Sequence, residues 1–197
     1  MARYTGPIQK KLRSLGLDKY GVYGEKKKVN PVGGRRRRIS GYGLQLKEKQ
    51  KAKFLYGILE RQFSNYYKKA SLMEGSTGEN LIVLLEKRLD NVLYRSGLFT
   101  TRNQSRQAVN LGHFTVNSKK VNIPSFQVSI GDEIAWTPKG LKTKLFESSV
   151  ELSKEIAPPH WLQLEKNTST TTVTKDPSPE DGEIVIDMRQ IVEFYSK

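Results

Sequence analysis

The first 42 residues limit the fold of this chain most strongly, because they have few apolar side chains that could join a hydrophobic core. They contain scattered glycine and proline, few apolar side chains and little periodicity. Such a segment cannot bury enough apolar surface to offset the conformational entropy lost on ordering. We therefore expect residues 1–42 to form a basic N-terminal arm that is weakly structured alone and is ordered by its partner.

Positive charge is also concentrated at this end. Residues 1–70 hold 19 Lys and Arg against 4 Asp and Glu, a surplus of +15, whereas the whole 197-residue chain carries +14. A like-charged cluster repels itself, and a polyanion relieves that repulsion. The first candidate partner is nucleic acid, the second is an anionic membrane surface, and the third interpretation is a charge that serves only solubility.

The composition of the chain excludes several kinds of site and of protein. The chain has no cysteine, which excludes disulfides and thiolate metal sites, and its two histidines, His113 and His160, are far apart. We therefore expect no metal and no other cofactor. The N-terminus lacks the apolar run of a secretory signal, and the longest aliphatic run, LIVLL at 81–85, is too short to cross a bilayer. We expect no membrane partner and a protein that works where it is made.

Residues 44–70 carry apolar side chains at three- and four-residue steps, which predicts one amphipathic helix. Lys47 and Lys51 continue the apolar stripe towards the N-terminus, whereas Lys49 and Lys53 face the other way. Cations therefore ring this end of the predicted helix. We interpret that end as a phosphate-facing surface, with a solvated helix end as the alternative.

A second helix is predicted over about 79–95. Ser76 followed by Glu79 fits a capping box at its start. Arg88 and Arg95 are seven residues apart and would share one face at the edge of its apolar stripe.

A third, short helix is predicted after Thr101, which forms a capping box with Gln104. Its polar arc holds Arg102, Asn103, Arg106 and Asn110. The segments HFTVN and VNIPSFQV then flank the turn SKK and read as a hairpin, followed by the strand GDEIAW. A helix pair that leads into a small twisted sheet, with Lys119 and Lys120 at the turn, predicts a compact basic face.

The C-terminal part reads as a helix over about 141–154, a loop over 167–182, a short strand at 184–186 and a terminal helical turn. Residues 176–197 carry six acids against Arg189 and Lys197. We expect this acidic tail to pack on the N-terminal helix or on a protein neighbour rather than on RNA.

The segment from Leu85 to Val128 resembles the small RNA-binding module named after ribosomal small-subunit protein four. MARYTGP at the start, YGLQLKEKQKAKFLYGILERQFSNYYKKA at 42–70, GSTGENLIVLLE at 75–86 and IVEFYSK at the end resemble the bacterial-type protein-four family itself. The likeness covers nearly the whole chain. It implies an α+β fold with a mostly helical domain built from both chain ends, 43–84 plus 155–197, and the RNA-binding module, 85–154, inserted between them.

The resemblance also implies a function. Members of this family are primary binders of small-subunit ribosomal RNA at a junction in its 5′ domain, where they nucleate assembly, and some repress translation of their own operon. The acidic tail would lie near small-subunit protein five, at an interface linked to decoding accuracy. We expect ribosomal RNA contacts at Arg3, Lys10, Lys11, Arg13, Arg36, Arg37, Lys47, Lys49, Lys51, Lys53, Arg61, Lys68, Arg88, Arg95, Thr101, Arg102, Asn103, Ser105, Arg106, Asn117, Lys119 and Lys120.

Two features depart from the family pattern. Many relatives hold zinc with four cysteines in the arm, whereas this chain has none, so its arm must be ordered by RNA or by local packing. The hairpin turn usually reads Asn-Gly, whereas here it reads Asn117-Ser118, which is a less favourable pair for a tight turn.

The run GGRRRRISGYG places four consecutive arginines where messenger RNA enters the small subunit in this family. Arg35 and Arg38 match the positions implicated in opening structured messenger. Guanidinium groups can hold single-strand phosphates and stack on bases, and the lack of a GxxxxGK[ST] motif makes any unwinding passive. A plain ribosomal RNA clamp and an address tag are the alternatives.

Other function classes compete with this interpretation. RNA-modifying enzymes carry the same module but need a separate catalytic domain, for which this chain has no room, and Asp90 reads as a helix-surface residue that pairs with arginine. A general nucleic-acid or chromatin protein is compatible with the charge alone. We expect a structural, non-enzymatic protein of the bacterial cytoplasm, with the plastid stroma as the alternative.

Overall fold

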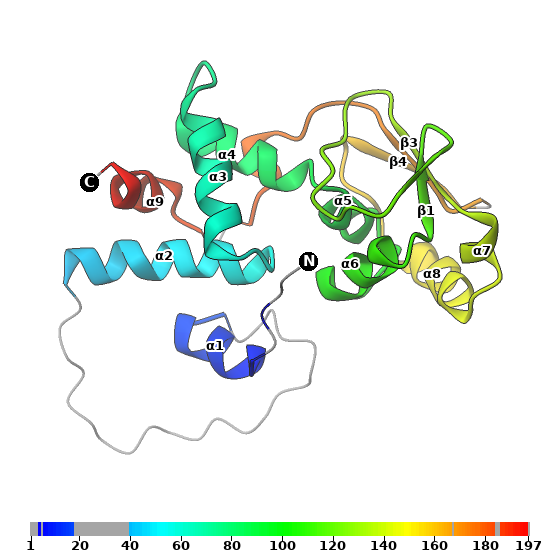
Figure 1. Cartoon of the computed structure of the whole chain (residues 1–197), viewed down its shortest axis with the longest axis horizontal. Coiled ribbons are helices and arrows are strands. Elements are labelled where there is room, and N and C mark those ends of the chain that lie inside the picture. The colour runs from blue at the N-terminus through cyan, green and yellow to red at the C-terminus, as the bar shows by residue number, and fades with distance from the viewer. Residues whose placement is uncertain (1–3, 5, 18–39, 167, 184–185, 197) are drawn as a thin grey trace. The chain divides into compact units, whose positions relative to one another are not determined.

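The computed structural model describes residues 4, 6–17, 40–166, 168–183 and 186–196 (Figure 1). These residues form α-helices and one five-stranded antiparallel sheet, which confirms the α+β class. The chain divides into two compact units, one made of residues 1–65 and 184–197 and the other of residues 66–183. The predicted helical unit built from both chain ends is thus present, but its boundaries differ from those expected.

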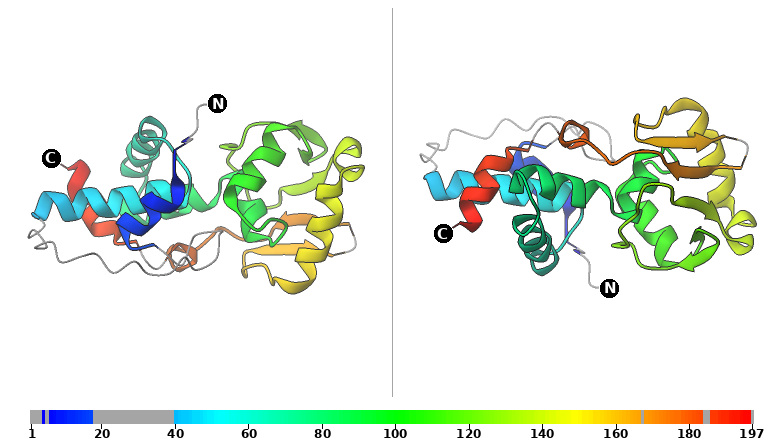
Figure 2. Two further views of the ribbon diagram at one scale, coloured as in Figure 1. Left: turned by 90° about the horizontal axis from the view of Figure 1, so that it is seen from below. Right: turned by 90° about the horizontal axis from the view of Figure 1, so that it is seen from above.

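The first unit contains helices from both ends of the chain. They are α1 (Ile8–Leu15), α2 (Gly41–Leu55), the first half of α3 (Glu60–Ser71) and α9 (Met188–Tyr195). Helix α9 packs against α2, beside which it lies in Figure 1 and which it crosses in both views of Figure 2. The side chain of Gln45 donates to Glu193 over 2.8 Å across this contact. The expectation that the tail packs on the N-terminal helix is confirmed.

Part of the predicted arm is an ordered helix. Leu12 and Leu15 of α1 are buried, as is Leu17 just beyond it, and α1 contacts α2. The helix ends at Gly16, which has a left-handed φ of 77°. Leu12 and Leu15 are three residues apart and share one face of α1, and Leu17 follows the end of the helix, so this short segment does supply apolar surface to a core.

The single helix predicted over 44–70 is wrong, because the structure breaks it between Leu55 and Glu60. Gly57 has a φ of 62° and its N–H donates to the Phe54 carbonyl, while the Ile58 N–H donates to the Lys53 carbonyl over 2.9 Å. This pair of bonds is the Schellman motif that ends many helices. Gly57 was therefore the helix-stop signal inside an otherwise helical pattern.

The second unit is built around the sheet, whose strands lie in the order β2-β1-β3-β5-β4. The strands are β1 (Phe114–Val116), β2 (Lys119–Val121), β3 (Glu133–Trp136), β4 (Leu162–Glu165) and β5 (Thr170–Val173). The other elements are α4 (Thr77–Glu86), α5 (Leu89–Arg95), α6 (Arg102–Asn110), α7 (Pro138–Leu141), α8 (Lys144–Glu155) and the 3₁₀ turn η2 (Pro179–Asp181). Their shared core contains Phe99, Phe114, Trp136 and the fully buried Trp161.

The helix predicted over 79–95 is also wrong, because it is two helices, α4 and α5. Arg88 lies between them with extended backbone, φ −71° and ψ 135°. Its neighbours pair with the segment around Gln127: the Leu89 N–H donates to the Phe126 carbonyl, and the Val128 N–H donates to the Lys87 carbonyl. This non-local pairing replaces the helical bonds. Ser76 begins α4 without a side-chain capping bond, so the predicted capping box does not form.

The predicted hairpin is present as β1 and β2, with Asn117 and Ser118 alone in the turn. Both residues have positive φ, 49° and 64°, as the type I′ hairpin turn requires. The Asn117 amide donates to Asp132 over 2.7 Å, and its oxygen accepts from the Glu133 N–H. The side chain of Asn117 therefore anchors the turn to the start of β3.

The expected strand GDEIAW is β3, and the helix expected over 141–154 is α8, with α7 before it. The loop predicted over 167–182 is wrong in part, because β5 lies within it and pairs with both β3 and β4. Residues 155–183 consequently belong to the second unit and not to the helical unit. Residues 184 and 185 of the predicted strand at 184–186 lie outside the described residues. No helix among the described residues is long and apolar enough to cross a membrane.

Candidate nucleic-acid interface

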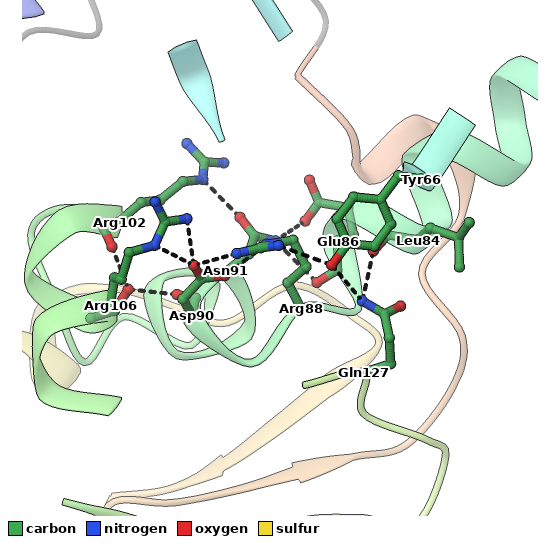
Figure 3. Close-up of polar contacts among 10 residues, drawn as sticks. Tyr66, Leu84, Glu86, Arg88, Asp90, Asn91, Arg102, Arg106 and Gln127 are labelled. Carbon is green, nitrogen blue, oxygen red and sulfur yellow. Dashed lines mark hydrogen bonds and ion pairs between the residues drawn. The ribbon is translucent and has the colours of Figure 1, made fainter. Parts of the chain in front are cut away.

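The arginines predicted to bind RNA in the second unit lie in a network of buried carboxylates, and Figure 3 shows three of them, Arg88, Arg102 and Arg106. Arg88, at the junction of α4 and α5, is fully buried. Its Nε and Nη2 donate to the two carboxylate oxygens of Asp90 over 3.0 and 2.8 Å, and its Nη1 donates to the Tyr66 hydroxyl over 2.9 Å. Burial alone would lower the pKa of Arg88, but Asp90 and Tyr66 together raise it above its usual value. The charged guanidinium of Arg88 thus connects Asp90 to Tyr66 inside the protein.

Asp90 also binds Arg106 of α6. The Nε and Nη2 of Arg106 donate to Oδ2 of Asp90 over 2.8 and 2.6 Å. Asp90 is only 2% exposed, so two guanidinium groups share one buried carboxylate. The prediction that Asp90 pairs with arginine is confirmed, whereas its expected position on a helix surface is wrong.

A second buried carboxylate, Glu86 at the end of α4, organises the rest of the network. Arg95 donates to both of its oxygens, over 3.0 and 2.9 Å, and the Asn91 amide donates to it over 2.7 Å. Arg102 then donates to Asn91 over 2.7 Å and to Glu183 over 2.6 Å. These bonds join α4, α5, α6 and the segment after η2.

The main role of these four arginines is therefore to stabilise the fold through ion pairs. The expected common face of Arg88 and Arg95 does not exist, because α4 and α5 are separate helices. Arg88 is enclosed by protein and cannot reach a phosphate in this conformation. The side chains of Arg102 and Arg106 are 10% and 13% exposed and are held by carboxylates. Ser105 is buried with them, and Thr101 caps α6 by accepting from the Gln104 N–H.

Three of the four lysines predicted to face RNA on α2 also have acidic partners. Lys49 is 6% exposed, binds Glu60 over 2.7 Å and lies 4.2 Å above the centre of the Phe194 ring. Lys53 binds the other oxygen of Glu60, and Lys51 binds Glu48 over 2.6 Å. The expected orientation of Lys49 away from the core is therefore wrong. Lys47 is half-buried.

Burial raises the pKa of Glu60, but hydrogen bonds from Lys49, Lys53 and Tyr195 outweigh it and leave that pKa below its usual value. Glu60 is thus a charged hub that ties α2 and α3 to the terminal helix α9.

The remaining predicted contacts divide by position. On α1, α3, α6 and the hairpin, eight of them are exposed: Lys10, Lys11, Arg13, Arg61, Lys68, Asn103, Lys119 and Lys120. Asn117 is exposed too, although its amide is committed to Asp132. Arg3 and the block Arg35, Arg36, Arg37 and Arg38 lie outside the described residues. The exposed cations are the side chains able to meet a phosphate without breaking an internal ion pair.

Sequence reasoning missed the carboxylates that occupy the arginines, and it missed exposed lysines on α7 and α8. No helical spacing signalled these pairs, because Arg88 and Asp90 are two residues apart and Glu86 and Arg95 are nine apart, whereas ion pairs along a helix join residues three or four apart. Lys139, Lys142 and Lys144 follow β3 closely and extend the positive charge of the hairpin lysines. No cluster of three or more potential metal ligands occurs among the described residues.

A small α+β module with exposed lysines on a hairpin, joined in one chain to a basic helical unit, defines a class of nucleic-acid-binding protein. The module matches the S4 domain over residues 87–134, and the preceding part matches the ribosomal protein S4/S9 N-terminal domain over residues 3–86. The chain is 49% identical to small ribosomal subunit protein uS4 of Corynebacterium kroppenstedtii over 201 residues. It is 47% identical to that of Chloroflexus aurantiacus and 46% identical to that of Roseiflexus castenholzii, each over 207 residues. All three alignments cover 100% of both chains. The chain belongs to the uS4 family.

Proposed function

We propose that this protein is a primary binder of small-subunit ribosomal RNA, that it grips a helix junction in the 5′ domain, and that it nucleates assembly there. As a member of the uS4 family it is a structural, RNA-binding protein of the small ribosomal subunit and not an enzyme. The main support for the proposal is the full-length similarity to uS4 proteins. This chain also matches both domains of that family.

The charge distribution supports the proposal. Residues 1–70 keep a surplus of +15 after their four acids, Glu48 and Glu60 among them, are subtracted, and the ion pairs of these two glutamates are with lysines of α2. The exposed cations of α1, α3 and the hairpin supply phosphate contacts in this scheme. Arg88, Arg95, Arg102 and Arg106 have a supporting role, in which they fix the helices that carry the exposed residues.

The test is binding of the purified protein to the 5′ domain of small-subunit ribosomal RNA across a salt series, with duplex DNA of equal length as competitor. Neutralising about eight phosphates gives a slope of log K against log salt of about −6 to −7. Tight binding that DNA does not displace supports the proposal, because RNA is distinguished by its 2′-hydroxyls and its shape. Weak binding that any polyanion displaces would sink it in favour of a general nucleic-acid protein.

We further propose that Arg35 and Arg38 contact messenger RNA where it enters the subunit. This rests on their place in the sequence, just before Tyr42 and Gly43, and on guanidinium chemistry. Ribosomes with Arg35→Ala and Arg38→Ala should translate through a stable messenger hairpin more slowly than wild type. The matched control is Arg36→Ala with Arg37→Ala, which removes the same charge from the middle of the block. Equal rates for all three would remove the proposal.

The acidic tail has a second proposed role, as a neighbour of small-subunit protein five at an interface linked to decoding accuracy. Glu193 and Asp187 are exposed on or beside α9 and offer carboxylates to a basic partner. Glu193→Lys should weaken association with protein five and raise misreading, whereas Glu147→Lys, on exposed α8, should change neither. Binding of its own messenger as a repressor, and residence in the bacterial cytoplasm, complete the proposal. The bacterial relatives support that residence.

A further inference from the structure

The exposed lysines of the second unit differ from its arginines in one respect. Arg88, Arg95, Arg102 and Arg106 each bind a carboxylate. In the described part of the chain, no carboxylate oxygen lies within 4.0 Å of the ammonium groups of Lys119, Lys120, Lys139, Lys142 and Lys144. The four arginines are thus paired with acids, whereas these five lysines form a surface with uncompensated charge.

Two of these lysines meet at one corner, where the end of α6, the strand β2 and the helix α7 come together. The side chain of Lys120 lies across Gly112: a Cβ atom on that glycine would be 2.5 Å from Cε of Lys120 and 3.1 Å from its Nζ. Lys139 precedes Gly140, where a Cβ atom would be 2.8 Å from the carbonyl oxygen of His113. Only the approach at Gly140 leaves no room for a side chain, so the backbone beside Lys139 lies against His113, while the flexible end of Lys120 covers Gly112. Both lysine charges act on the His113 imidazole.

The backbone of this corner is fixed. The Thr137 N–H donates to the His113 carbonyl over 2.8 Å, and the Thr137 hydroxyl donates to the Gly112 carbonyl over 3.3 Å. The same hydroxyl oxygen accepts from the Gly140 N–H. The two lysines therefore start from fixed backbone positions, so binding a ligand has to order their side chains and not the loop that carries them.

His113 is an unsatisfied group within this corner. Its side chain is 6% exposed, and its Nδ1 has no hydrogen-bond partner among the described residues. Burial lowers the pKa of His113, and the charges of Lys139 and Lys120 lower it further. The corner thus holds two uncompensated positive charges beside an imidazole that they keep neutral.

We propose that the ammonium groups of Lys120 and Lys139 at this corner bind a phosphodiester group of RNA beside the imidazole of His113. The inference rests on the proposed function, in that RNA is the partner. Ammonium groups bind phosphate as compact point charges, and a phosphate between them replaces mutual repulsion by attraction. The phosphate contacts of the module therefore centre on lysines of β2 and α7 and not on the arginines of α6.

The first test is the salt dependence of binding to the 5′ domain RNA. Lys120→Ala and Lys139→Ala should each make the log–log slope shallower by about 0.7–0.9, because each removes one phosphate contact. The matched control is Lys166→Ala. Lys166 is exposed and follows β4, which lies at the opposite edge of the sheet from β2. The log–log slope of the Lys166→Ala variant should equal that of the wild type.

The second test uses His113 as a reporter, through the NMR titration of its imidazole. In the free protein, Lys120→Ala or Lys139→Ala should raise the pKa of His113, because a like charge is removed. In the wild type, bound RNA should raise it too, and in the double variant this second rise should be smaller. Inorganic phosphate alone, used as a separate probe, distinguishes a general anion site from one that needs the RNA backbone.

The outcomes separate this inference from the proposed function. If the wild type binds the RNA tightly but the lysine variants keep its slope and bound RNA leaves the pKa of His113 unmoved, the corner is not a phosphate site and the proposed function stands. If the wild type itself fails to bind, the proposed function fails. In that case a His113 pKa that inorganic phosphate does not raise overturns the corner as well, and a rise supports an anion site for another source of phosphate.

Discussion

Asp90 of α5 holds the guanidinium of Arg106 on α6, with Nη2 and Nε of the arginine 2.6 and 2.8 Å from one carboxylate oxygen. The same carboxylate binds Arg88, which is fully buried. The packing of α5 on α6 is thus fixed by a shared ion as well as by the apolar core. This arrangement makes the network sensitive to the loss of any one member.

Asp90→Asn should lower the free energy of unfolding by about 3–5 kcal/mol, since it leaves Arg88 buried without a counter-charge. Urea denaturation measures the change. Glu147→Gln is the control, because Glu147 is exposed on α8 and surface changes stay within about 0.5 kcal/mol. A variant as stable as the control would contradict the structural role assigned to Asp90.

Arg102→Ala and Arg106→Ala should each reduce stability by about 1–3 kcal/mol, because the first removes the donor to Asn91 and Glu183 and the second removes one of the two guanidinium groups on buried Asp90. Their effect on the salt slope of RNA binding should be well below the shift of about one that a lost phosphate contact causes. Thermal unfolding and a salt series on the same preparations test both parts. If a variant changed the salt slope by about one and kept its stability, the replaced arginine would be a phosphate contact and not a structural residue.

Ser118→Gly should stabilise the hairpin. Ser118 has a φ of 64°, which costs a residue with a Cβ atom roughly 1 kcal/mol or more, whereas the extra freedom of unfolded glycine cancels part of the gain. A net increase of about 0.5 kcal/mol should appear as a higher Tm. Ser148→Gly, in the exposed interior of α8, should lower the Tm instead, and stabilisation at both positions would rule out the backbone explanation.

Glu60 should contribute to acid unfolding of the first unit. Its pKa is lowered from 4.5 in the folded protein, so its stabilising effect is present above pH 4.5 and is lost as pH falls through the folded value. Glu60→Gln should cost about 1 kcal/mol or less at pH 7, because the side chain is 46% exposed, and should flatten the dependence of stability on pH below 4.5. Denaturation at several acidic pH values measures it, and an unchanged slope would contradict the prediction.

His113 should affect stability at a higher pH than Glu60 does. Its folded pKa lies below 6.5, so as pH falls from 6.5 to that value the unfolded chain binds more protons than the folded one, and stability decreases. His113→Gln should remove this part of the pH dependence. His160→Gln, on a side chain that is 60% exposed, should leave it in place. The measurement is the free energy of unfolding between pH 5 and 7.5, and identical curves for all three proteins would be evidence against it.

Several features could be predicted from the sequence because they depend on local signals. The periodic leucines of α5, the Thr101 cap of α6, the alternation in GDEIAW and the apolar face of α9 each encode their element within a few residues. The family likeness of Leu85–Val128 and its flanks then identified the RNA-binding class. Gly57 was an equally local stop signal, and the long helical pattern around it concealed it.

The sequence by itself thus specified the types of most elements from α2 to α8, the class of protein and the position of the positive charge. Tertiary structure decided which cations face inward. Arg88 becomes buried because its backbone pairs with the segment at Gln127, 39 residues away, and Lys49 is buried because α9 returns from the far end of the chain to cover α2. No pattern within one helix encodes a carboxylate supplied by another. Burial and counter-ions depend on contacts between distant residues, and these contacts leave Lys120 and Lys139, rather than the arginines, facing outward.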